Sequence, residues 1–98
     1  MQETSSTFRK QSGQNLWVRN SENFPVVLCI EPWANEIQLL TGNDYHVIFE
    51  GPEGEFPAVE WGKNRITLYG WSGSVAQVFL AGKEVLSCAN PVPAMPKR

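Results

Sequence analysis

The chain has 98 residues, 42% of them hydrophobic, and a formal net charge of −2, which fits one small globular domain. Its lysines and arginines are scattered rather than gathered in a stripe, so nucleic acid is excluded as an expected partner. The longest unbroken apolar run, Val26 to Ile30, is too short to span a bilayer, so we expect no membrane partner either.

Both ends of the chain have the composition of flexible segments. Residues 1–14 are polar and charged with a single phenylalanine, which predicts a disordered N-terminal tail. Residues 90–98 carry a proline at every second or third position, which predicts a Pro-rich flexible C-terminal tail. The N-terminus lacks the apolar stretch of a secretory signal, which points to the cytoplasm. The folded domain is therefore predicted to span residues 15–89.

Short runs of alternating polar and apolar residues fill this domain, and turn-forming residues separate them. In residues 45–50, for example, Tyr45, Val47 and Phe49 would face one side of a strand. Pro57 marks the fifth run as an edge or bulged strand, because proline cannot donate to a ladder. No window shows helical periodicity. The predicted strands cover residues 16–19, 24–31, 36–40, 45–50, 56–61, 65–71, 75–81 and 84–88.

This spacing of about eight short strands predicts an all-β fold, an antiparallel β-sandwich of cupredoxin-like or immunoglobulin-like type. Sandwiches of the cupredoxin type include the blue-copper proteins, so a copper site is one candidate. His46, Cys88 and Met95 follow the order of blue-copper ligands, but such sites need a second histidine between the cysteine and the methionine. The chain has one histidine, so these three residues are weak metal candidates and we expect no cofactor.

The two cysteines, Cys29 and Cys88, are predicted to be free thiols in a reducing compartment, with a disulfide between them as the alternative. Together with one histidine they also fall short of a zinc site. A thiol–imidazole pair of Cys88 and His46 would be the simplest nucleophilic arrangement, although nothing in the sequence places the two together.

Other catalytic patterns are incomplete. The segment Gly70-Trp71-Ser72-Gly73-Ser74 is similar to a nucleophile elbow, but it ends in serine and no helix is predicted after it. A glycosidase needs a pair of acids, and the sequence offers a cluster of four: Glu50, Glu53, Glu55 and Glu60. A charged loop and solvent-facing strand positions explain this cluster equally well. We therefore expect a protein that is not an enzyme.

The four tryptophans, Trp17, Trp33, Trp61 and Trp71, exceed what so small a core obviously requires. Trp33 and Trp71 lie at predicted strand ends beside turns, where exposed rings could anchor a protein partner. With Trp61 and Tyr69 they form the predicted set of binding residues.

The composition and the aromatic set predict a non-enzymatic module that binds a protein partner, or associates with itself, through a sheet edge or an exposed aromatic patch. A sandwich that binds carbohydrate or another small ligand is the first alternative. A copper-binding relative of the cupredoxins is the second.

One resemblance supports the fold without adding a mechanism. The run Glu31-Pro32-Trp33-Ala34-Asn35-Glu36-Ile37, then Leu40-Thr41-Gly42 and Phe49-Glu50-Gly51-Pro52, resembles small uncharacterised bacterial β-sandwich proteins with an E-P-W-x-x-E core. Tyr69-Gly70-Trp71 continues the likeness, which covers about residues 25–81. Those proteins have a proline where Thr41 stands here. The resemblance implies a bacterial β domain and no assigned activity.

Overall fold

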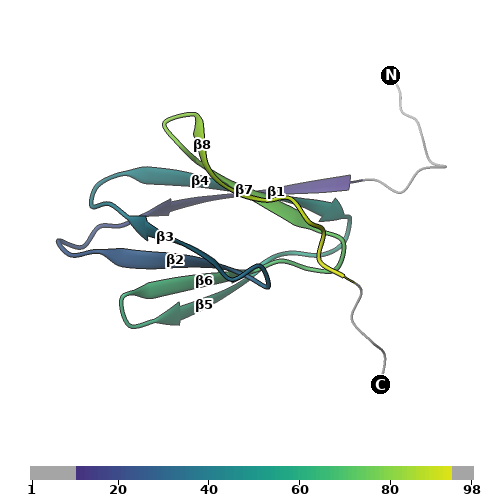
Figure 1. The fold of residues 1–98 in the computed structure, drawn as a ribbon, viewed down its shortest axis with the longest axis horizontal. Coiled ribbons are helices and arrows are strands. Elements are labelled where there is room, and N and C mark those ends of the chain that lie inside the picture. The colour runs from purple at the N-terminus through teal and green to yellow at the C-terminus, as the bar shows by residue number, and fades with distance from the viewer. Residues whose placement is uncertain (1–10, 94–98) are drawn as a thin grey trace.

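A computed structural model describes residues 11–93, and the regular structure in this part of the chain is entirely β-sheet (Figure 1). The predicted fold class, an all-β sandwich of eight short strands, is confirmed. Residues 11–93 contain no helix of the length and hydrophobicity needed to cross a membrane. The strands are β1 (Gln11–Arg19), β2 (Val26–Glu31), β3 (Asn35–Leu39), β4 (Asp44–Pro52), β5 (Ala58–Gly62), β6 (Arg65–Tyr69), β7 (Val75–Leu80) and β8 (Lys83–Cys88).

The strands form two four-stranded sheets that lie face to face as two layers (Figure 1). Sheet I has the order β1-β4-β7-β8, and sheet II has the order β3-β2-β6-β5. Neighbouring strands are antiparallel with one exception, since β2 and β6 run parallel. The sequence did not predict this pair. It arises because the chain leaves sheet II after β3, forms β4 in sheet I, and returns through β5 to place β6 beside β2; a parallel pair needs such a long crossover.

Period-two alternation determines which side chains fill the space between the sheets. In β4, Tyr45, Val47 and Phe49 are buried while His46 and Ile48 face outward, as the sequence predicts. The buried cluster draws on both sheets and comprises Val26, Leu28, Ile30, Leu39, Tyr45, Val47, Phe49, Ile66, Leu68, Trp71, Ala76, Val78 and Cys88.

Both predicted tails are shorter than expected. β1 begins at Gln11, inside the predicted N-terminal tail, because β4 is long enough to pair residues 11–14 with residues 49–52. At the other end, Val92 is buried and its backbone N–H and C=O bond to Ser74 and Gly73. The contacts of the folded domain therefore extend beyond the predicted boundaries of 15 and 89, to residues 11–14 and to Val92. The rest of both predicted tails, residues 1–10 and 94–98, lies outside the described residues.

Candidate functional site

One long side of the sandwich is closed and the other is open. On the closed side, β3 meets β8, and the Asn35 side-chain amide donates a hydrogen bond to the Cys88 sulfur at 3.3 Å. On the open side, the edge strand β1 of sheet I lies across from the edge strand β5 of sheet II, and a groove separates them. The prediction from Pro57 that this fifth strand is an edge strand is confirmed.

Within residues 11–93, the inner face of β5 is left open. Val59 and Trp61 lie in register with Leu68 and Ile66 of β6, which are buried. Because paired residues in a sheet point to the same face, Val59 and Trp61 also face the interior. They are nevertheless 43% and 74% exposed, so the opposite strand β1 leaves them open to solvent.

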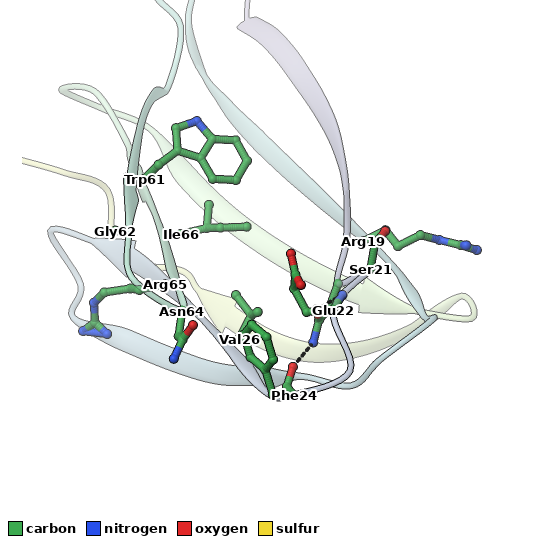
Figure 2. A pocket seen from close by; sticks show the side chains of 11 residues that line it. Arg19, Ser21, Glu22, Phe24, Val26, Trp61, Gly62, Asn64, Arg65 and Ile66 are labelled. Atoms are coloured by element: carbon green, nitrogen blue, oxygen red, sulfur yellow. Dashed lines mark hydrogen bonds between the residues drawn. The ribbon is translucent and has the colours of Figure 1, made fainter.

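The resulting groove has a volume of about 300 Å³ and an apolar lining. Its lining residues come from both edges and from the sheet floor: Leu16, Trp17, Val18, Arg19, Val59, Trp61, Ile66 and Leu68. A second hollow of about 240 Å³ extends it toward the loop between β1 and β2, and the two hollows share Arg19, Trp61 and Ile66. We call this continuous depression the Trp61 groove. Figure 2 shows the Trp61 ring standing beside Ile66 at its wall.

The far end of the Trp61 groove is built by the loop between β1 and β2. Asn20, which is buried, donates its side-chain amide to the carbonyl oxygens of Phe24 and Leu39, both at 2.9 Å. Its side-chain oxygen accepts the Glu22 N–H at 2.9 Å. These bonds fix the loop so that Phe24 and Val26 line the hollow and Glu22 faces it from the other side (Figure 2).

Of the charged side chains at this end of the Trp61 groove, the two arginines have ion-pair partners within residues 11–93 and the glutamate does not. Arg19 forms an ion pair with Asp44, and Arg65 forms one with Glu36, each at 2.6 Å. Both guanidinium groups point away from the hollow in Figure 2. The hydrogen bond and charge of Arg19 lower the pKa of Asp44. The Glu22 carboxylate, in contrast, has no ion-pair partner within the described part of the chain.

Two of the predicted binding tryptophans have a structural role instead. Trp71 is buried against Phe49, and its indole N–H donates to the Pro52 carbonyl oxygen at 3.0 Å. Trp33 is half-buried, and its indole N–H donates to the Asn90 carbonyl oxygen at 2.7 Å. Trp71 is therefore not an exposed ring, and Trp33 is only partly exposed and is bonded to the segment at Asn90.

The other two predicted binding residues lie on different faces of sheet II. Trp61 projects into the groove. Tyr69 is on the outer face, where its hydroxyl donates to Glu60 at 2.5 Å, and this bond raises the pKa of Tyr69. The structure therefore does not bring Trp33, Trp61, Tyr69 and Trp71 together into one patch, and Trp61 is the member with a large free surface.

A further aromatic row, on the outer face of sheet I, was missed. Trp17 is 68% exposed and stacks on His46, with ring centroids 4.2 Å apart and an interplanar angle of 6°. Phe79 continues the row, 6.4 Å from His46, and Asn15 Oδ1 lies 2.7 Å from His46 Nε2. Trp17 and His46 stack face to face and Phe79 is tilted by 44° to His46, so the row presents the single exposed ring of Trp17 rather than a pair of coplanar rings. The alternation of residues along β1 could have predicted that Trp17 faces outward. The row itself could not be predicted, because it depends on the register of β1, β4 and β7.

The weak metal candidates are not brought together. His46 faces outward from sheet I, Cys88 faces the interior from the same sheet, and Met95 lies outside the described residues. Within residues 11–93, no three His, Cys, Asp or Glu side chains gather as a ligand set. Cys29 and Cys88 are free and buried.

Neither thiol is activated as a nucleophile. Burial raises the pKa of both Cys88 and Cys29, and a hydrogen bond to Glu31 raises that of Cys29 further. Ser72 donates to the Pro93 carbonyl oxygen at 3.4 Å rather than to a histidine. Of the acids considered for glycosidic chemistry, Glu60 bonds to Tyr69, and the other three are exposed: Glu50, Glu53 and Glu55.

No protein-family model matches this chain, and no curated protein and no solved structure matches it significantly. The geometry of the described residues is therefore the basis for a functional assignment.

Proposed function

We propose that this domain is a non-enzymatic binding module that accepts an extended segment of a partner protein along β5, with the Trp61 groove receiving side chains of that segment. The observation that carries the proposal is the exposure of Val59 and Trp61, 43% and 74%, at positions that face the interior of the sandwich. Side chains at such positions are normally covered by the opposite sheet.

The backbone of β5 supports the same interpretation. β5 is the last strand of sheet II, so its second side has no strand neighbour among the described residues. An extended partner segment can continue the sheet there through main-chain hydrogen bonds. Alternate side chains of that segment would then point into the groove between β5 and β1, because strand side chains alternate between faces.

The physical cost of leaving this edge open also supports a binding role. Exposed edge strands with apolar side chains promote aggregation, and proteins usually shorten, charge or cover them. Pro57 and Glu60 limit such pairing here, yet the two inward-facing side chains of β5, Val59 and Trp61, remain exposed. Covering the exposed part of the Trp61 ring would contribute about 3 kcal/mol, enough for an anchor residue at an interface.

The test is selection of peptides from a displayed random library against the full chain, followed by affinity measurements with two variants. Trp61→Ala should weaken the selected peptides by about tenfold or more, because it removes the anchor ring. Phe79→Ala is the matched control, since Phe79 is an aromatic residue on the outer face of sheet I and lines neither hollow of the groove. Peptides that depend on Phe79 and are indifferent to Trp61 would contradict the proposal.

A second candidate function uses the outer face of sheet I. Trp17, His46 and Phe79 border an apolar hollow of about 400 Å³ beside the turn at Ala81 and Gly82, which fits a small ligand such as a sugar. A panel of oligosaccharides titrated against wild type and Trp17→Ala tests it. Binding that is lost in Trp17→Ala would support this second function, and absence of binding to wild type would remove it.

A further inference from the structure

The segment that comprises β5 and the loop before it is acidic, and Lys63 follows it in the turn after β5. Residues 53–62, which comprise the loop before β5 and β5 itself, contain three glutamates and no lysine or arginine. All three glutamates are exposed: Glu53, Glu55 and Glu60, the last of which faces the outer side of sheet II. The same stretch exposes three large apolar side chains, Phe56, Val59 and Trp61. A segment that approaches β5 therefore meets apolar and negatively charged groups together, which favours a basic partner.

The hollow at the end of the groove has the same character. Trp61 forms one wall, Val26 and Ile66 form the floor, and the Glu22 carboxylate faces the space from the other side (Figure 2). The arginines that also line it, Arg19 and Arg65, are already held by Asp44 and Glu36. Glu22 is thus the one charged group facing the hollow for which residues 11–93 supply no counter-ion.

We infer that the segment bound along β5 carries a lysine or arginine whose side chain enters this hollow, between Trp61 and Glu22. The inference rests on the proposed function and specifies its partner. The methylene stem of such a side chain packs on the apolar floor formed by Val26 and Ile66. Its cation contacts the face of the Trp61 ring and makes a charge-assisted hydrogen bond to Glu22.

A second copy of this chain is a poorer occupant. Antiparallel pairing of β5 with β5 of another copy about its central residue places two Glu60 side chains opposite each other, and like charges directly opposite are unfavourable. An acidic or purely apolar segment is also disfavoured, because it covers the Glu22 carboxylate without replacing its hydration by a counter-charge.

The test uses synthetic extended peptides of alternating valine and threonine that differ at one central position, which is lysine, arginine, norleucine or glutamate. Binding to the full chain is followed by titration calorimetry and by the indole N–H resonance of Trp61. The lysine and arginine peptides should bind about tenfold more tightly than the norleucine peptide, and this preference should shrink as salt is added. Glu22→Gln should abolish the preference, whereas Glu50→Gln, an exposed acid on sheet I, should preserve it.

The remaining outcomes separate the partner chemistry from the function. Equal affinities across the peptide series that still depend on Trp61 would overturn the inference of a basic partner. They would leave the proposed binding of a segment along β5 standing. A series that never perturbs the Trp61 resonance would overturn both. Concentration-dependent self-association that Trp61→Ala abolishes would show that a second copy fills the groove, and this result would also overturn the basic partner.

Discussion

Trp71 and Trp61 belong to the same small sandwich but differ in almost every physical respect. Trp71 is 7% exposed, packs on Phe49 with ring centroids 6.0 Å apart, and has its indole N–H bonded to Pro52. Trp61 is 74% exposed, and no hydrogen bond to its indole is found within residues 11–93. Val92 is hydrogen-bonded to the turn that contains Trp71, whereas nothing within residues 11–93 covers the Trp61 ring. The burial of a ring here depends on what lies opposite it, not on its residue type.

The largest expected effect comes from truncating the two rings in turn. Trp71→Ala should lower the free energy of unfolding by about 3–5 kcal/mol, because it removes a buried ring and leaves a cavity. Trp61→Ala should lower it by about 1 kcal/mol or less, as expected for a surface position. Urea unfolding of both variants measures the difference, and equal losses would show that Trp61 is packed in solution.

Two glycines give a second comparison between the same regions. A Cβ at Gly51 would lie 2.7 Å from the Ser74 Cα, so Gly51→Ala forces the backbone apart. We expect a loss of about 2–3 kcal/mol in the free energy of unfolding, in the range of overpacked cores. A Cβ at Gly62 in β5 meets nothing closer than the Arg65 Cβ at 3.8 Å, and Gly62→Ala should change stability by about 0.5 kcal/mol or less. Thermal or urea unfolding distinguishes the two.

The buried thiol on the closed side predicts a pH effect. Burial raises the pKa of Cys88 above its ordinary value of 9.0, so the folded protein keeps this proton to higher pH than the unfolded chain does. Its contribution to stability is complete below about pH 9 and is lost as the pH rises toward the folded-state pKa. The decline in the free energy of unfolding on the alkaline side should be shallower in Cys88→Ala. An identical decline in both proteins would show that this thiol is not shielded from solvent.

The smallest change in stability is expected at Val59. Val59→Thr is nearly isosteric on a strand that is exposed along its whole length, so the free energy of unfolding should move by about 0.5 kcal/mol or less. Affinity for peptides selected on the wild type should nevertheless fall, because the hydroxyl enters the apolar groove. A Val59→Thr variant that loses stability and keeps its affinity would show that Val59 supports the fold rather than binding.

The strands themselves were predictable because they depend on local alternation. The sequence shows which residues of β4 and β7 face inward, and it marks β5 as an edge through Pro57. Inward orientation, however, does not imply burial. Val59 and Trp61 face inward by their register with β6, but their exposure depends on where β1 lies in the other sheet, and no local feature encodes this.

The same limit explains the candidate site. Trp33 and Trp71 stand beside turns, which suggests exposure, yet the segment around Val92 packs onto that end of the sandwich. Glu22 belongs to a polar turn and has no local sign of facing Trp61. The parallel pairing of β2 and β6 is equally non-local. None of these features could be predicted, because each depends on how distant segments of the chain are placed relative to one another.

The most direct test of a binding strand at β5 is the set of intermolecular nuclear Overhauser effects between a selected peptide and the isotope-labelled full chain. We expect backbone contacts from the peptide to Val59 and Trp61, and side-chain contacts to Leu16 and Ile66 across the groove. Contacts confined to Trp17, His46 and Phe79 on the outer face of sheet I would contradict this assignment.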